Sequence, residues 1–346
     1  MPRLIDRIIR LTSLRHREEM DLCLVQAARE RLGATEAQLV RMLGDAGDER
    51  WLTPCRIDAD GQVHVADVSW IDQGDLPLAA TQPDWLECVR LGQELARPTA
   101  GAVAAADTTT LFPVRGSAGI DGVLRLVSPQ PPGEDARADV RGLVEIFHNQ
   151  VSMLDYTESD TLTGLLNRKS FDDSFYRASA LPLSQVGDDL ERRQRAAQRY
   201  WLGVIDIDHF KQVNDQHGHL IGDEVLLLLA RVMRQTFRLL DRLYRFGGEE
   251  FVVMLRCPDE EGAMAAMERF RQRVQSYPFP RVNHVTVSIG FTDIRSGDTP
   301  PAAVERADLA VYYAKHHGRN QVRSHAALVR EGALVDVAQT SDVEFF

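Results

Sequence analysis

The stretch RLLDRLYRFGGEEF, residues 238–251, carries the pattern that decides the fold. A strand-like run is interrupted by two glycines and resumes as FVVML, which is typical of two antiparallel strands joined by a tight turn. Gly247 and Gly248 can adopt positive φ and leave the backbone open to a ligand. Glu249 and Glu250 follow directly, and adjacent carboxylates repel each other unless water or a cation stabilises both. The stretch predicts a β-hairpin with an acidic tip.

A second acidic strand end occurs upstream, in VIDIDHF at residues 204–210. Val204 and Ile205 indicate a buried strand, and Asp206 and Asp208 share one face if the strand stays extended. A buried carboxylate needs a partner, which a metal ion can supply; acids solvated by water at a strand end are the alternative. If the sheet brings this strand end beside the hairpin tip, the oxygen atoms suit Mg²⁺.

The composition is that of an ordinary globular protein, with 346 residues of which 44% are hydrophobic and 26% charged. Two domains are expected, because single cores rarely grow past about 250 residues. The formal net charge of −11 argues against nucleic-acid or anionic-membrane binding, but not against a small phosphorylated ligand. We expect no secretory leader and no bilayer-spanning run. Four widely separated cysteines fit a reducing cytoplasm.

The order of the expected elements divides the chain. The first half opens with amphipathic helices and continues in short strands, whereas the second half alternates strands with helices, as in α/β proteins. Residues 136–160 predict a helix with apolar residues at alternating steps of four and three, namely Val140, Val144, Phe147, Val151 and Leu154. This spacing fits either the seam of a short coiled coil or a face packed on a neighbouring domain. Residues 181–199 predict a charged connector.

Five motifs together resemble the diguanylate cyclase family. GGEEF at 247–251 is a variant of the family's GGDEF signature. The others follow the family's order: DTLTGLLNR at 160–168, DIDHFKQVND at 206–215, GHLIGDEVL at 218–226 and YYAKHHGRN at 312–320. The resemblance covers roughly residues 156–323. It implies a palm-like nucleotide-cyclase domain that condenses two GTP molecules into cyclic di-GMP and pyrophosphate.

The resemblance assigns metal and catalytic roles to the two acidic strand ends. Asp206, the backbone carbonyl of Ile207 and Glu249 would hold Mg²⁺, with Mn²⁺ as a substitute, against the GTP phosphates. Glu249 and Glu250 would be the catalytic carboxylates. Glu249 would help to deprotonate the attacking hydroxyl, although a metal-held carboxylate is a weak base, and Glu250 would support it.

The resemblance also implies a GTP site. Asn214 and Asp223 would recognise guanine, because a carboxylate accepts hydrogen bonds from adjacent N–H donors that adenine does not offer in that arrangement. The other contacts would be phosphate-neutralising cations and pocket-lining residues: Lys211, Lys315, Arg319, Phe210, His219, Gly247 and Gly248. For Lys315 and Arg319, a basic helix C-terminus favoured by the helix dipole is the alternative.

Arg238 and Asp241 match the family's RxxD inhibitory site. Product cyclic di-GMP would bind there, with Arg238 donating to phosphate or guanine and Asp241 accepting from guanine. A plain ion pair between the two side chains is the alternative. Because each catalytic domain offers one GTP half-site, the resemblance also implies a homodimer whose assembly controls activity.

The N-terminal half is similar in outline to a GAF sensor domain, an antiparallel sheet with helices. The expected organisation is a GAF-like sensor domain at 1–135, a connecting signalling helix at 136–160, a GGDEF domain at 161–323 and a tail at 324–346, either frayed or packed as a strap. No residue set identifies the sensor's ligand, and a PAS-like sensor or a ligand-free dimerisation module are alternatives. The competing functions are a catalytically silent module that binds cyclic di-GMP or GTP, an adaptor, and a cyclase with a mixed purine product.

Overall fold

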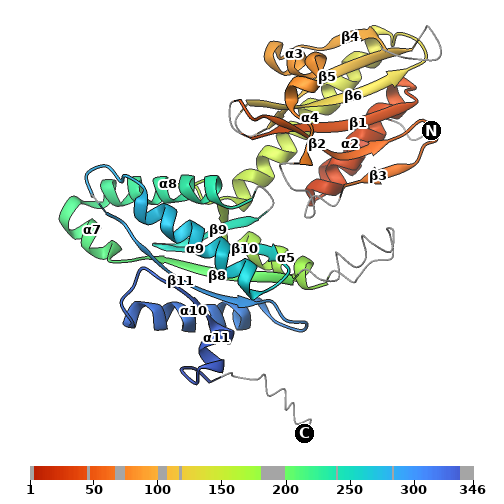
Figure 1. Ribbon diagram of the computed structural model, residues 1–346. Coiled ribbons are helices and arrows are strands. Elements are labelled where there is room, and N and C mark those ends of the chain that lie inside the picture. The colour runs from red at the N-terminus through yellow and green to blue at the C-terminus, as the bar shows by residue number, and fades with distance from the viewer. Residues whose placement is uncertain are drawn as a thin grey trace. The chain divides into compact units, whose positions relative to one another are not determined.

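The computed structural model describes residues 4–44, 47–66, 75–99, 107–116, 119–180, 199–238, 241–282 and 284–335. The chain divides into two compact units, Met1–Thr157 and Glu158–Phe346, and each is built on its own six-stranded sheet (Figure 1). The expected charged connector lies outside the described residues, except for Arg199 at its end.

The N-terminal unit is an antiparallel sheet covered by helices. Its strands are β1 (Glu36–Leu43), β2 (Arg50–Ile57), β3 (Val63–Val65), β4 (Leu95–Pro98), β5 (Thr108–Gly116) and β6 (Gly119–Ser128), in the order β3-β2-β1-β6-β5-β4. Its helices are α1 (Leu4–Ser13), α2 (Arg17–Leu32), α3 (Pro83–Leu91) and α4 (Glu134–Glu158), with a short 3-10 helix, η3 (Ala79–Thr81). One core joins α1, α2 and α4 to the sheet, and a smaller core joins α3 and η3 to it.

Helix α4 confirms the helix expected at 136–160, but it begins and ends two residues earlier, at Glu134 and Glu158. Val140, Val144, Phe147 and Val151 are buried within the core that α4 forms with α1, α2 and the sheet. The alternating four- and three-residue spacing therefore reflects packing inside the N-terminal unit. The coiled-coil interpretation of these positions is wrong, because a buried side chain has no surface left for a second copy.

The C-terminal unit has a mixed α/β architecture. Its strands are β7 (Leu166–Asn167), β8 (Arg199–Ile207), β9 (Arg242–Gly247), β10 (Glu250–Cys257), β11 (Val287–Asp293) and β12 (Val322–Ser324), in the order β12-β11-β8-β10-β9-β7. Its helices include α5 (Arg168–Ala180), α7 (Phe210–His217), α8 (His219–Thr236), α9 (Glu260–Ser276), α10 (Pro300–His316) and α11 (His325–Arg330). The four inner strands pair antiparallel, and β12 and β7 add in parallel at the edges.

The two faces of this sheet carry different helices (Figure 1). Helices α8 and α9 pack on the face that contains Ile205 and Ile207, whereas α5 and α10 pack on the face that contains Leu202 and Val204. Successive side chains of a strand alternate between faces. Asp206 therefore continues the α5/α10 face at the end of β8.

Helix α10 lies unusually close to the sheet at Gly290 on β11. A Cβ atom on Gly290 would lie 2.2 Å from the carbonyl oxygen of Ala307 and 2.4 Å from the backbone nitrogen of Val311. Only glycine allows that approach of helix backbone to strand backbone. The contact fixes the position of α10, and with it Lys315 in the last helical turn.

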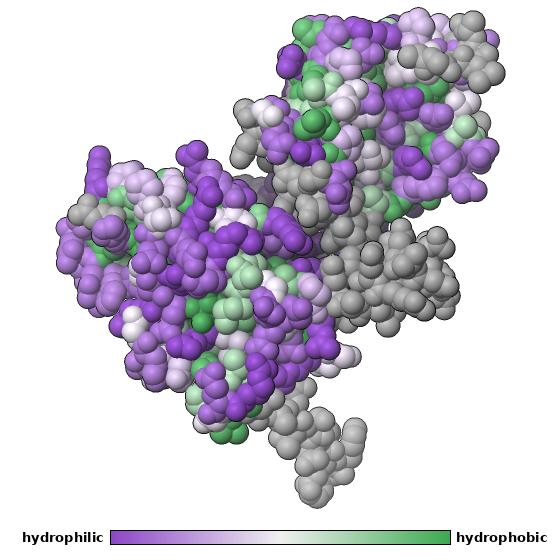
Figure 2. Space-filling view, viewed as in Figure 1, coloured by the Kyte–Doolittle hydropathy of each residue, from purple (hydrophilic) through white to green (hydrophobic). Residues whose placement is uncertain are grey.

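Part of the expected C-terminal tail is structured. Residues 325–330 form α11, in which His325 and Leu328 are buried, while residues 336–346 lie outside the described part of the chain. None of the described helices combines the length and the apolar character needed to cross a bilayer. The visible surface of both units is largely hydrophilic (Figure 2).

Candidate active site

The strand register brings the two acidic strand ends together. Glu250, the first residue of β10, pairs with Asp206 on β8, and Ser288 on β11 pairs with Asp206 from the other side. Residues directly opposite each other in an antiparallel pair project to the same face, with Cβ atoms about 5 Å apart. The hairpin tip and the upstream strand end thus form one site, as the sequence predicts.

Asp206 is the centre of this site. Its side chain is 9% exposed, and its Oδ2 atom accepts an ion pair of 2.7 Å from the Lys315 ammonium. Its Oδ1 atom is buried and has no hydrogen-bond partner among the residues that the structure describes. Burial raises the pKa of Asp206, and Lys315 opposes that rise. A buried carboxylate oxygen without a partner is uncommon, and a hard cation is the kind of ligand that would satisfy it.

The hairpin turn owes its shape to its glycines. Gly247 has φ 141° and Gly248 has φ 52°, conformations that L side chains rarely adopt, and no atom lies within 4 Å of a Cβ built on either residue. Glu249 is half-buried at this turn. Burial and the nearby Asp206 carboxylate raise the pKa of Glu249. The backbone around the glycines is open. The raised pKa of Glu249 indicates that nearby positive charge does not fully stabilise its ionised form.

Arg245 holds the turn in place, a role that the sequence analysis misses. Its Nη2 donates to the Gly248 carbonyl over 2.9 Å, and its Nη1 donates to Asp160 Oδ1 over 3.1 Å. Asp160 in turn accepts hydrogen bonds from the backbone and hydroxyl of Thr163. The motif that opens at residue 160 is therefore tied to the acidic hairpin through one guanidinium.

Asp208 does not share the environment of Asp206. Its Oδ1 accepts a hydrogen bond of 2.7 Å from Ser288 Oγ. Its Oδ2 accepts bonds of 2.7 Å from Thr286 Oγ1 and 3.0 Å from the Asn320 N–H. Both oxygens are used by the protein, so the metal interpretation fits Asp206 and does not fit Asp208.

The expected phosphate-binding cations come from two elements. Lys315 and Arg319 lie at the end of α10 and in the turn that follows it, and Lys211 lies in the first turn of α7. Lys211 and Arg319 are exposed, and neither has a carboxylate partner among the described residues. Lys315 is the exception, because the structure pairs it with Asp206.

The expected guanine-binding residues lie on the α7–α8 helix pair. Asn214 is on α7, and His219 and Asp223 are in the first turns of α8. A Cβ on Gly222 would lie 1.9 Å from Asn214 Oδ1 and 3.3 Å from the ring of the buried Phe210. Gly222 therefore makes room for both side chains. Its place inside the GHLIGDEVL motif was the only sequence signal for it.

The expected metal ligands do not by themselves complete the coordination of a metal ion. Within the described ranges, no three His, Cys, Asp or Glu side chains are grouped in a way that could hold a metal ion. The expected set contains only the carboxylates of Asp206 and Glu249 and the carbonyl of Ile207. Since Mg²⁺ commonly completes its coordination with substrate phosphates and water, this arrangement fits a metal that arrives with a nucleotide.

Residues 157–321 match the family profile described as diguanylate cyclase, GGDEF domain. The matched residues make up most of the C-terminal unit, which is therefore similar to a GGDEF domain. The match leaves the N-terminal unit almost wholly outside it.

Known proteins resemble the chain over the same region. Diguanylate cyclase DgcP of Pseudomonas aeruginosa is 37% identical over 167 residues, which are 47% of this chain and 23% of that protein. Response regulator PleD of Caulobacter vibrioides is 38% identical over 180 residues, 50% of this chain and 37% of that protein. The chain spans less than half the length of either relative.

Among solved structures, diguanylate cyclase SiaD in complex with its activator SiaC, from Pseudomonas aeruginosa, is 34% identical. The alignment covers 55% of this chain and 70% of that chain, with a TM-score of 0.46. The coiled coil and GGDEF domain of DgcB from Caulobacter crescentus, in complex with c-di-GMP, is 31% identical, with coverages of 55% and 98% and a TM-score of 0.45.

The two residues of the expected inhibitory site lie together in the C-terminal unit, but not as a plain ion pair. The Arg238 N–H donates to Asp241 Oδ2 over 2.8 Å, and the Asp241 N–H donates to the Arg238 carbonyl over 3.0 Å. Arg238 is exposed, and its guanidinium has no ion-pair partner in the described part of the chain. Burial raises the pKa of Asp241 to about 6. The arrangement leaves a free guanidinium beside a carboxylate.

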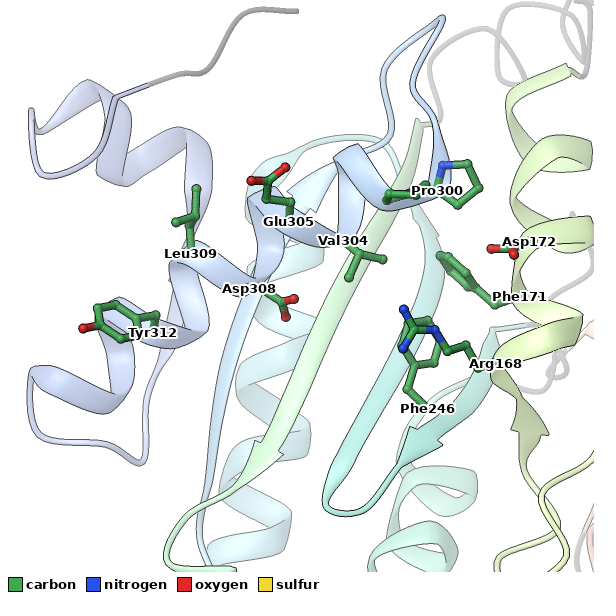
Figure 3. A pocket seen from close by; sticks show the side chains of 11 residues that line it. Arg168, Phe171, Asp172, Phe246, Pro300, Val304, Glu305, Asp308, Leu309 and Tyr312 are labelled. Atoms are coloured by element: carbon green, nitrogen blue, oxygen red, sulfur yellow. The ribbon is translucent and has the colours of Figure 1, made fainter.

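A cavity of about 440 Å³ lies beside β9, the strand that leads into the acidic hairpin of the C-terminal unit (Figure 3). It lies between α5, β9 and α10 and is lined by Arg168, Phe171, Asp172, Phe246, Pro300, Pro301, Val304, Glu305, Asp308, Leu309 and Tyr312. The Arg168 guanidinium lies over the Phe246 ring, 5.3 Å from its centroid. Partial burial, together with the charges of Glu250 and Asp206, raises the pKa of Asp308 to about 6. The carboxylates of the acidic site therefore act electrostatically on Asp308, a residue that lines this cavity.

Proposed function

We propose that the protein is a signal-regulated diguanylate cyclase that condenses two GTP molecules into cyclic di-GMP and two pyrophosphates. The family match of residues 157–321 and the relatives named as diguanylate cyclases support the reaction class. The observation that carries the proposal is the buried, unpartnered Oδ1 of Asp206. It lies in the same site as the Lys315 ammonium and opposite Glu250 in the strand ladder.

The proposed metal is Mg²⁺, with Mn²⁺ as a substitute, held by Asp206, the carbonyl of Ile207 and Glu249. One oxygen of Asp206 has no hydrogen-bond partner among the described residues, and burial and the Asp206 carboxylate raise the pKa of Glu249. A hard dication would stabilise both carboxylates, so the residues fit it. When bound, the metal would supply charge neutralisation at the phosphates.

The chain's own residues would bind and orient each GTP. Asp223 would accept hydrogen bonds from the guanine N–H donors and Asn214 would bind the same base, while His219 and Phe210 would line the base pocket. The three cations Lys211, Lys315 and Arg319 would neutralise the phosphates. Gly247 and Gly248 would let the nucleotide approach the hairpin backbone.

In each of two successive steps, the 3′-hydroxyl oxygen of one GTP would attack the α-phosphorus of the other. A new phosphorus–oxygen bond forms, and the bond to pyrophosphate breaks. The hydroxyl proton would pass to the Glu249 carboxylate, which is a weak base while it also holds the metal. Glu250, opposite Asp206 in the ladder, would support the negative field that attracts the metal.

Two GGDEF domains must face each other, because each offers one GTP half-site; we therefore propose a homodimer. Product inhibition would act at Arg238 and Asp241, where the free guanidinium and the adjacent carboxylate match the acceptors of a phosphate and the donors of a guanine.

The N-terminal unit would be a GAF-like sensor for an unidentified ligand, with α4 as the connecting signalling helix. Its six-stranded antiparallel sheet with helices on both faces supports this assignment. We further propose that the protein acts in the cytoplasm, where its nucleotide substrate is found.

Incubation of the purified protein with GTP and Mg²⁺, followed by chromatography and mass analysis, tests the function. Cyclic di-GMP and pyrophosphate in a 1:2 ratio are expected, because two condensations release two pyrophosphates. Binding of GTP without product, at every protein concentration that favours dimers, would instead support a silent nucleotide-binding module.

A further inference from the structure

The turn after α10 has three consecutive residues with positive φ. Gly318, Arg319 and Asn320 have φ values of 106°, 59° and 44°. Glycine tolerates positive φ. In Arg319 and Asn320 such φ values raise the conformational energy, because the Cβ atom of each residue crowds the backbone. Strained residues of this kind persist only where surrounding contacts hold them, and they are often found at functional sites.

Several hydrogen bonds hold this turn. The Arg319 N–H donates to the Ala314 carbonyl over 3.0 Å, and the Arg271 Nη1 donates to Asn320 Oδ1 over 2.7 Å. The Asn320 N–H donates to Asp208 Oδ2 over 3.0 Å. Of these anchors, only Asp208 belongs to the loop that leaves β8, the strand that carries Asp206.

Asp208 is itself firmly held. Its side chain is buried and accepts hydrogen bonds from Ser288 Oγ and Thr286 Oγ1, both over 2.7 Å, and its backbone N–H donates to the Thr286 carbonyl over 2.9 Å. A buried carboxylate with these partners cannot move independently of the sheet. It therefore fixes the turn relative to the end of β8.

We propose that Asp208 is a positioning residue for Arg319. By fixing the Asn320 N–H, it would hold the left-handed turn that carries Arg319 against the end of β8, the strand that also carries Asp206. Arg319 is exposed and has no carboxylate partner in the described part of the chain, and it would then meet the phosphates of the nucleotide whose metal Asp206 binds. This proposal rests on the proposed function, because it requires that GTP binds at this site.

The role can be separated from general stability by comparing two ligands. The probe 3′-deoxy-GTP carries the phosphates but lacks the attacking hydroxyl, so it binds without reacting, whereas guanosine carries no phosphates. Asp208→Asn keeps the size of the side chain but replaces one acceptor oxygen with a donor. We expect it to weaken 3′-deoxy-GTP binding about tenfold and guanosine binding less than about twofold, measured by calorimetry with Mg²⁺ present.

A double-mutant cycle with Arg319→Ala is the decisive measurement. If Asp208 acts through Arg319, Asp208→Asn should weaken 3′-deoxy-GTP binding by less than about twofold in the Arg319→Ala background. Equal losses in both backgrounds would overturn the proposal, and so would a parallel loss of guanosine affinity.

Two further variants protect the interpretation. Thr286→Val removes another hydrogen bond to the same Asp208 oxygen but leaves the contact of Asp208 with the turn, so it should weaken 3′-deoxy-GTP binding more than guanosine binding, by a smaller factor than Asp208→Asn does. If Asp208→Asn does not fold, Asn320→Ala provides a second test of the turn. It removes the side-chain hydrogen bond between the turn and Arg271, and it should likewise weaken 3′-deoxy-GTP binding more than guanosine binding. A wild-type protein that binds neither ligand would refute the proposed function, whereas normal binding with additive losses would refute only this inference.

Discussion

The Lys315 ammonium lies 2.7 Å from one carboxylate oxygen of Asp206, and the other oxygen of that carboxylate is buried without a partner. The two residues come from elements that are more than a hundred positions apart in the sequence. One oxygen is neutralised by the protein, and the other is left for a cation. This division makes Asp206 the residue on which the proposed metal site depends.

Asp206→Asn should therefore lower the rate of cyclic di-GMP formation by at least about a hundredfold, because it removes the charge that attracts the metal while keeping the shape of the side chain. The rate is measured by chromatography of the products. Glu261→Gln, which removes an exposed carboxylate on α9, should leave the rate within about twofold. A comparable rate in both variants would remove Asp206 from the metal site.

Gly222→Ala should weaken GTP binding about tenfold, because the new methyl group would displace Asn214 Oδ1, which lies 1.9 Å from the Cβ position. In an Asn214→Ala background the same change should cost little, since the side chain it displaces is gone. Gly142→Ala is the control, because Gly142 is a helical glycine of α4 with no atom within 4 Å of its Cβ position. Equal effects of Gly222→Ala in both backgrounds would contradict the assigned contact.

Gly290→Ala and Gly203→Ala form a matched pair of strand substitutions. A Cβ on Gly290 meets the backbone of α10 at 2.2 Å, whereas a Cβ on Gly203 meets the flexible end of Met267 at 2.3 Å. Backbone cannot yield as a methionine terminus can, so Gly290→Ala should cost the C-terminal unit about 3 kcal/mol or more and Gly203→Ala about 1–2 kcal/mol. Chemical denaturation gives both values, and the reverse order would show that α10 can shift away from β11.

Phe147→Ala should destabilise the N-terminal unit by about 3–5 kcal/mol, because Phe147 is 1% exposed in its core and the truncation leaves a cavity. Met153 is on the same helix and is 65% exposed, so Met153→Ala should cost less than about 0.5 kcal/mol. Unfolding of the N-terminal unit, followed by circular dichroism, tests the pair. A Phe147→Ala protein that keeps its stability but loses dimerisation would restore the coiled-coil interpretation.

Product inhibition should depend on pH through Asp241, whose pKa burial raises to about 6. Above that pH the carboxylate is ionised and accepts from guanine N–H groups; below it the group is protonated and its acceptor strength falls. The concentration of cyclic di-GMP that half-inhibits the enzyme should therefore rise as pH is lowered from about 7.5 to about 5. Asp241→Asn should weaken inhibition and flatten this dependence, and an unchanged pH profile in that variant would assign the titration to another group.

Local sequence patterns were sufficient for much of the C-terminal unit. The paired glycines at 247 and 248 predict a turn because few other residues adopt their φ values. The apolar residues that precede Asp206 predict a buried strand. The order of five motifs then indicates the resemblance to the GGDEF family. The apolar spacing of α4 likewise predicts a helix, because periodicity is a property of neighbouring residues.

Only the tertiary structure decided what those residues contact. In the sequence, Asp206 and Asp208 look equivalent, since both end the same strand and alternation puts them on one face. In the fold, Asp208 receives hydrogen bonds from Ser288 and Asn320, which are 80 and 112 positions away, while Asp206 keeps one oxygen free. The same holds for Phe147, whose partners on α1, α2 and the sheet are set by how distant elements pack. A pattern of neighbours determines the local backbone, but the partner of a side chain depends on contacts that the chain makes only once it has folded.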